Sequence, residues 1–76
     1  MNLSNVKLNC KAKIIKLNIQ DINILRRICD LGLYPNQTVT VLNKSILKKV
    51  VLLSVKNYTL CLQTKIANCI EVQIEH

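Results

Sequence analysis

Aromatic residues are scarce in this chain of 76 residues, which contains two tyrosines, Tyr34 and Tyr58, and neither phenylalanine nor tryptophan. Proteins that hold single-stranded nucleic acid rely on aromatic side chains for base stacking. This shortage therefore argues against RNA-binding folds of the OB and RRM types. Glycine and proline occur once each, and the chain contains no low-complexity stretch, internal repeat or flexible linker.

Long apolar runs are also missing. The longest, Val50-Val51-Leu52-Leu53, has the length of a short strand, whereas a transmembrane helix needs about 20 apolar residues. The first residues contain neither the apolar segment nor the small-residue cleavage site of a signal peptide. We therefore expect a cytoplasmic protein that does not span a membrane.

Catalytic signatures are absent as well. The sequence has no Ser-His-Asp set and no glycine-rich phosphate loop, and its one histidine, His76, is the last residue. The four acidic residues form no obvious pair: they are Asp21, Asp30, Glu71 and Glu75. We expect neither enzyme activity nor a cofactor.

Apolar residues make up 50% of the chain and are mostly leucine, isoleucine and valine. This composition excludes an intrinsically disordered segment and can fill one small core, so we expect a single globular domain over residues 1–76. Eleven Lys and Arg against four Asp and Glu give a net charge of +7. That excess favours nucleic acid, phospholipid or an acidic protein surface as a partner, and its sign does not choose among them.

Four cysteines are scattered along the chain with no Cys-x-x-Cys pair: they are Cys10, Cys29, Cys61 and Cys69. Zinc sites usually take their ligands in close pairs, so we expect no metal site. Outside the cell the cysteines could form disulfides with any of three connectivities, but a reducing compartment predicts free thiols that pack as small apolar groups. Cys61 and Cys69 are the weak candidates for a metal-binding pair, and His76 beside Glu75 is a poor one.

Period-two alternation from Cys10 to Ile19 predicts a first strand, and the adjacent Ile14 and Ile15 predict a β-bulge because they shift its phase. Before it, Asn9 tolerates a left-handed turn and can separate a short lead-in from the strand. One helix is predicted next. Its cap is Asp21, its stop is Gly32, and its apolar positions are Ile22, Leu25, Ile28, Cys29 and Leu31.

Residues 33–36 predict a turn, in which Pro35 fixes φ and Asn36 can take the left-handed position. Further strands are predicted at residues 37–43, 50–55, 59–62 and 70–74, with turns at 44–49 and 56–58 and one helical turn at 64–68. Five short strands with one inserted helix indicate a mainly β, partly open small barrel.

Residues 25–41 resemble the signature of the ferrous iron transport protein A (FeoA) family. The similarity lies in an Arg-apolar pair at Arg27-Ile28, the Leu31-Gly32-Leu33 motif, a turn at Pro35 and the alternating strand through Val39 and Val41. Further agreement comes from Leu3-Ser4, Ala12-Lys13-Ile14, Leu60-Cys61-Leu62, Ala67 and Ile70-Glu71-Val72. Asn9 and Asn36 stand where the family usually has glycine, and the Gly-Pro pair common before the third strand is absent from residues 45–49.

The resemblance implies an SH3-like barrel in the bacterial cytoplasm. It also implies a small accessory or regulatory protein that works beside FeoB, the Fe(II) permease with a cytosolic G-domain. Because the same fold occurs as the C-terminal domain of metal-dependent repressors, the alternative is a metal-regulated or nucleic-acid-binding module. A third hypothesis is a metallochaperone that holds metal through Cys61 and Cys69.

Arg26 and Arg27 are candidate contacts to the permease, and Arg27 matches the family position. A guanidinium supplied to the G-domain would stabilise charge on the transferred phosphoryl group, while the simpler interpretation is a solvated helix face. Leu33 and Tyr34 are further candidates, because apolar and aromatic residues beside a turn often contact a partner. Burial of Leu33 in the core is the alternative.

Lysines supply the remaining candidate surface. Lys11 and Lys13 share one face of the first strand by the period-two rule. If Lys48 and Lys49 fold alongside them, they form a basic patch suited to an acidic protein or an anionic membrane. Otherwise these lysines protect an edge strand from aggregation. With the permease as the expected partner, we expect membrane contact to be peripheral and to occur through that partner, and we expect no small-molecule substrate.

Overall fold

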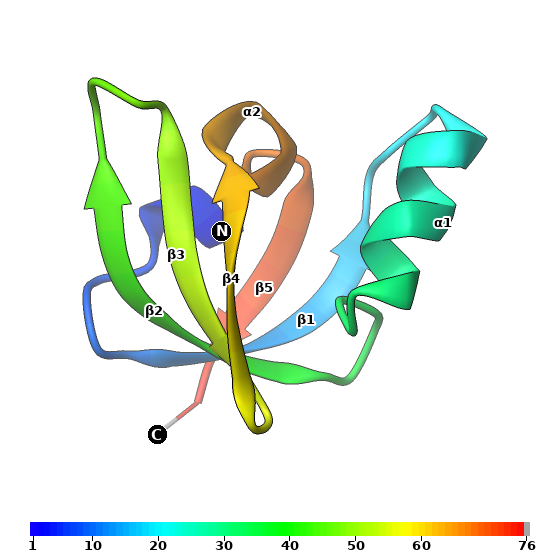
Figure 1. Cartoon of the computed structure of the whole chain (residues 1–76). Helices are drawn as coiled ribbons and strands as arrows, with labels where there is room; N and C mark the ends of the chain where they lie inside the picture. The colour runs from blue at the N-terminus through cyan, green and yellow to red at the C-terminus, as the bar shows by residue number, and fades with distance from the viewer. Residues whose placement is uncertain (76) are drawn as a thin grey trace.

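Five strands form one antiparallel sheet in the order β4-β3-β2-β1-β5, and the sheet curls into a partly open barrel (Figure 1). The computed structural model describes residues 1–75. The strands are β1 (Lys11–Leu17), β2 (Thr38–Ser45), β3 (Val50–Val55), β4 (Tyr58–Gln63) and β5 (Ile70–Ile74). The helices are η1 (Leu3–Asn5), α1 (Ile22–Asp30) and α2 (Thr64–Ala67). The predicted mainly β architecture with one inserted helix is confirmed.

The bulge predicted in the first strand is confirmed. β1 pairs with β5 from Ala12 to Ile14 and again from Lys16 to Leu17, and the register shifts between Ile14 and Lys16. Ile14 is buried whereas Ile15 is 40% exposed. The extra residue bends β1, so one strand can pair with β2 near its start and with β5 along its length.

Helix α1 begins and ends where its capping residues predict. The carboxylate of Asp21 accepts hydrogen bonds from the amides of Asn23 (2.9 Å) and Ile24 (3.4 Å). These bonds satisfy two of the amides that a helix leaves free at its start. At the other end Gly32 takes φ +97°, a conformation that side chains disfavour, and the chain turns back toward the sheet.

Both asparagines predicted to take left-handed conformations do so, with φ 65° at Asn9 and 75° at Asn36. The short polar side chain of asparagine makes this region accessible. The Asn36 amide donates to the carbonyl of Ile14 at 2.7 Å, which fixes the turn against β1.

The predicted boundaries of two hairpins were wrong. Lys44 and Ser45 belong to β2, where they pair with Val51 and Val50, so the turn covers residues 46–49 only. A second bulge between Val41 and Asn43 shifts the phase of the alternation, so a period-two pattern does not predict where β2 ends. Tyr58 likewise belongs to β4, where it pairs with Val55.

The first residues cover the outer edge of β5. The Val72 amide donates to the Met1 carbonyl at 2.8 Å, and Asn2 forms an isolated bridge with Glu71. Leu3 and Val6 then enter the core. The segment before β1 therefore closes one side of the barrel, and the predicted helical turn before β5 is confirmed as α2.

The core lies inside the curled sheet and consists of aliphatic side chains alone. Across residues 1–75, no polar or charged residue is fully buried. The buried residues are Leu3, Val6, Ala12, Ile14, Ile28, Leu33, Val39, Val41, Val51, Leu53, Val55, Leu62, Ala67, Ile70 and Val72. The polar and charged side chains of residues 1–75 therefore lie wholly or partly at the surface.

Candidate interaction surfaces

Helix α1 lies beside the barrel rather than across it (Figure 1). Ile28, near its C-terminal end, is its one fully buried residue, and the following Leu33 anchors the chain in the core. Arg26 and Arg27 are exposed on the helix. Ile22, at the other end, is 55% exposed. The helix thus presents two guanidinium groups and an apolar side chain to solvent.

The turn after α1 carries a small polar cluster centred on Tyr34. Its hydroxyl oxygen accepts hydrogen bonds from Gln37 Nε2 (3.1 Å) and Lys56 Nζ (3.2 Å). The same ammonium group lies 5.9 Å from the centre of the Tyr34 ring, within cation–π range. Lys56 comes from the β3–β4 turn, so the cluster joins two loops that are distant in sequence. Tyr34 is held in place while 38% of its surface remains exposed.

Leu33 does not fit its predicted contact role. It has no exposed surface, because the chain reverses at Gly32 and directs the next side chain into the core. The Leu33 amide donates to the carbonyl of Ile28 at 3.2 Å, which fixes this reversal. Burial, the alternative considered for Leu33, is what the structure shows. Tyr34, one residue later, is the exposed member of the pair.

A shallow hollow of about 370 Å³ separates the start of α1 from α2. Ile19, Ile24 and Ile66 form its apolar floor, and Asn18, Gln20 and Asp21 form part of its rim. All three isoleucines are half-buried. A single apolar side chain of a partner would find a complementary surface here. The sequence pattern did not single out Ile24, either as a core residue or as a contact residue.

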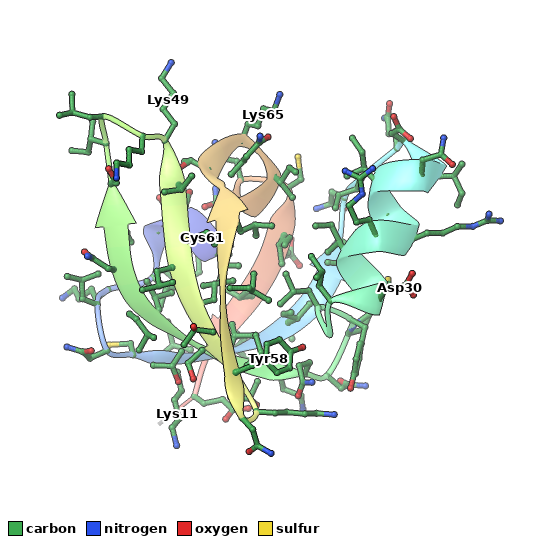
Figure 2. All side chains as sticks on the ribbon, in the orientation of Figure 1. Lys11, Asp30, Lys49, Tyr58, Cys61 and Lys65 are labelled. Atoms are coloured by element: carbon green, nitrogen blue, oxygen red, sulfur yellow. The ribbon has the colours of Figure 1, made fainter. Side chains whose placement is uncertain are left out.

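A larger groove of about 870 Å³ lies between the β2–β3 hairpin and α2, and it shares Lys65 with the hollow. We call it the basic groove, because its charged lining consists of Lys44, Lys48, Lys49 and Lys65. The Lys44 ammonium donates to the Ser4 carbonyl at 2.8 Å, and the Lys49 carbonyl accepts from the Thr64 amide at 2.9 Å. These bonds attach the hairpin to η1 and α2. The side chains of Lys49 and Lys65 point away from the barrel on the same side (Figure 2).

The four lysines of the predicted basic patch do not come together. Lys49 lies at the tip of the β2–β3 hairpin and Lys11 at the other end of the molecule (Figure 2). Lys48 lines the basic groove with Lys49, whereas Lys11 and Lys13 pair with Thr40 and Thr38. Edge protection is no better an account of the strand lysines, since β1 lies between β2 and β5. A period-two pattern predicts which face of the sheet a side chain lies on, but it does not predict which residues of other strands lie near it.

The cysteines remain separate thiols: Cys61 is exposed on β4, and the other three are half-buried. The Cys69 thiol donates to the Lys65 carbonyl at 3.5 Å. Residues 1–75 contain no group of three or more cysteine, histidine or acidic side chains placed to hold a metal ion. His76, the predicted poor ligand, lies outside the described residues.

No helix within residues 1–75 is both long and apolar enough to cross a bilayer. The sequence model of the FeoA domain matches residues 1–74. The chain belongs to the FeoA domain family. The resemblance noted in residues 25–41 is thereby confirmed, and membership of this family implies a role in ferrous iron transport.

Solved structures of FeoA proteins have the same fold. The solution NMR structure of FeoA from Chlorobium tepidum is 26% identical with a TM-score of 0.87, over 97% of this chain and 70% of that one. A FeoA-like protein from Clostridium acetobutylicum is 24% identical with a TM-score of 0.84, over 100% of this chain and 90% of that one. No match to this chain is found among curated proteins.

A manganese-dependent transcriptional repressor solved with manganese superposes with a TM-score of 0.91 at 16% identity. The match covers 99% of this chain but 36% of the repressor. At this identity the likeness concerns the fold, which is the SH3-like barrel shared by FeoA proteins and repressor C-terminal domains. The predicted fold class is confirmed.

Proposed function

We propose that this FeoA-family chain is a non-enzymatic accessory protein of ferrous iron uptake that works in the cytoplasm. It binds the cytosolic region of a FeoB-type permease through α1 and the following turn. Arg26, Arg27 and Tyr34 make the contacts, and Leu33 supports the turn from the core. The observation that carries the proposal is the placement of α1, which leaves both arginines and a fixed tyrosine exposed.

The chemistry of this surface supports a protein partner. Arginine and tyrosine are enriched at the centres of protein interfaces, where planar groups form hydrogen bonds and bury large areas at low entropic cost. Tyr34 is already held by Gln37 and Lys56, so binding would not need to order it. The nearby hollow over Ile19, Ile24 and Ile66 offers a pocket for an apolar anchor from the partner.

A calorimetric titration against the purified cytosolic region of the permease from the same cell tests the proposal, with and without guanine nucleotide. We expect saturable binding. Dependence on nucleotide would indicate that Arg26 or Arg27 lies near the phosphate groups, where a guanidinium can stabilise the transferred phosphoryl group. Absence of heat with either form would refute docking on the cytosolic region.

Variants then locate the surface. Arg27→Ala and Tyr34→Ala should each weaken binding about tenfold, because truncating an interface arginine or tyrosine commonly costs more than 1 kcal/mol. Lys7→Ala is the matched control: it removes one exposed positive charge away from α1 and the turn. Equal losses in Arg27→Ala and Lys7→Ala, with no loss in Tyr34→Ala, would mean that net charge, not this surface, drives association.

A metal-regulated or nucleic-acid-binding module is the alternative, and the fold shared with the manganese-dependent repressor favours it. A titration with duplex DNA separates the two functions. Binding driven by lysine–phosphate contacts would weaken steeply as salt rises. Tight DNA binding together with no response to the permease would replace the first proposal with the second.

A further inference from the structure

We propose that the tip of the β2–β3 hairpin binds the surface of an anionic phospholipid bilayer. Ile46 and Leu47 enter the interfacial layer, and the lysines of the basic groove contact the lipid phosphates. This surface is separate from α1, which lies on the other side of the barrel (Figure 1). The inference therefore does not depend on the permease-binding proposal.

The first observation is the exposure of two aliphatic side chains at one point. Ile46 is 91% exposed and Leu47 is 96% exposed, more than any other large apolar residue of the chain segment that the structure describes. They are adjacent at the end of a hairpin that projects from the barrel (Figure 1). Single exposed apolar residues are ordinary, but an adjacent pair at a protruding tip is the geometry that can enter a membrane interface.

The second observation is the charge around this pair. Lys44, Lys48 and Lys49 lie within three residues of it, and Lys65 joins them across the basic groove from α2. No acidic side chain lines the groove. Lysine side chains combine an apolar stem with a terminal charge, so they can lie along the interface and place the ammonium at the headgroups. Clustered lysines beside exposed apolar residues are typical of binding to anionic lipid.

The third observation is the fixed shape of the tip. The Lys48 amide donates to Ser45 Oγ at 3.2 Å, and Lys49 takes φ 55°. The Lys49 carbonyl accepts a hydrogen bond from the amide of Thr64, the first residue of α2, and Lys65 is the next residue of that helix. Lys49 and Lys65 point outward on the same side as a result (Figure 2). A flat anionic surface on that side can thus meet both ammonium groups, and the apolar pair belongs to the same turn as Lys49.

A protein partner or duplex DNA would use fewer features of this surface than a bilayer would. Lysine is depleted in protein interfaces, which favour arginine and aromatic residues, and the basic groove contains neither. Duplex DNA would use the lysines but would gain little from two aliphatic side chains at the outermost point. A bilayer uses both features, because its phosphates attract the lysines and its acyl boundary accepts the apolar pair.

Flotation with lipid vesicles tests the proposal, using the full chain at low and high salt. We expect the protein to float with vesicles of equal parts phosphatidylcholine and phosphatidylglycerol, and about tenfold less with phosphatidylcholine alone. Lys48→Gln with Lys49→Gln should lower binding at low salt toward the level that the original chain shows at high salt. Ile46→Ser with Leu47→Ser should remove the binding that persists at high salt, where charge is screened.

A matched control alters the same kinds of residue elsewhere. Leu8→Ser with Lys7→Gln and Lys11→Gln removes one exposed apolar residue and two charges outside the basic groove. It should bind as the original chain does, and thermal unfolding must show that every variant is folded. Equal binding to neutral and anionic vesicles, no flotation, or an equal loss in the control would overturn the proposal.

The fluorescence of an introduced tryptophan can report insertion of the tip, because the chain contains no tryptophan of its own. Leu47→Trp places a single indole at the tip, and its emission should shift to shorter wavelength with anionic vesicles, whereas Leu8→Trp should not shift. An unshifted Leu47→Trp would refute insertion of the tip. Lysine-dependent binding to duplex DNA without any vesicle binding would assign the basic groove to nucleic acid instead.

Discussion

The hydroxyl of Tyr58 donates a hydrogen bond to the main-chain carbonyl of Leu31, the C-cap residue of α1. Tyr58 is the first residue of β4, so this bond connects the β3–β4 hairpin to the helix. The same hydroxyl occupies the space into which a side chain at Gly32 would project. One tyrosine therefore connects the β3–β4 hairpin to the end of α1, and its hydroxyl would have to move to admit a side chain at position 32.

A double-mutant cycle between Gly32 and Tyr58 should show this dependence. Gly32→Ala should lower the free energy of unfolding by about 2 kcal/mol, because alanine is strained at positive φ and its methyl group meets the tyrosine hydroxyl. Tyr58→Phe alone should cost about 1 kcal/mol through the lost hydrogen bond. In the Tyr58→Phe background, Gly32→Ala should cost about 1 kcal/mol less. Denaturant unfolding measures all four proteins, and additive losses would contradict the steric explanation.

Asp21→Ala should destabilise the protein by about 1 kcal/mol, because it removes the acceptor for two amides at the start of α1. Helical circular dichroism should fall with it. Asp30→Ala is the control: it removes the same charge from the last residue of the helix, where a carboxylate opposes the helix dipole. That variant should be as stable as the original or slightly more. A similar loss in both would attribute the effect to net charge.

Leu33→Ala and Tyr34→Ala should differ sharply in stability although the residues are adjacent. Leu33 is fully buried, so its truncation should cost about 2–4 kcal/mol by leaving a cavity. Tyr34→Ala should cost less than about 1 kcal/mol, since its hydrogen bonds are exposed. Chemical denaturation measures both. A large loss in Tyr34→Ala would mean that its cluster with Lys56 supports the fold as well as the surface.

Cys61 should react first with a thiol reagent under native conditions, because it is the one exposed cysteine and the other three are half-buried. We expect one fast equivalent followed by slower ones, and Cys61→Ser should remove the fast phase without changing stability. Cys29→Ser should leave the fast phase intact. Protection of Cys61 and Cys69 by stoichiometric Zn²⁺ or Fe²⁺ would instead revive the metallochaperone hypothesis.

Local rules predicted the elements whose signals are themselves local. The Asp21 cap, the Gly32 stop and the left-handed Asn36 each depend on the conformation of one or two residues. The bulge at Ile14 and Ile15 was predictable because two adjacent apolar residues must interrupt a period of two. The adjacent Val41 and Leu42 gave the same signal for the bulge after Val41, but that bulge was not predicted, and the length of the β2–β3 hairpin was missed with it.

Surfaces were predicted less well, because they depend on which segments the barrel brings together. Lys48 belongs with Lys44 and Lys65, rather than with Lys11, through the contacts of the hairpin with η1 and α2. Leu33 and Tyr34 are adjacent in sequence yet lie inside and outside the barrel. A usable signal for the tip was present: an Ile-Leu pair stands between lysines at residues 44–49, within a predicted turn.

The hydrogen bond between Val72 and Met1 has a consequence for how the chain folds during synthesis. Met1 is made before strands β1 to β4, whereas its partner Val72 and the rest of β5 are made after them. β1 cannot complete its pairing until β5, its neighbour from Ala12 to Leu17, has been made. Hairpins β2–β3 and β3–β4 can form earlier from local contacts, whereas the distant pairing of the first and last segments is slow to close. The barrel is therefore completed only after Ile70–Ile74 has emerged.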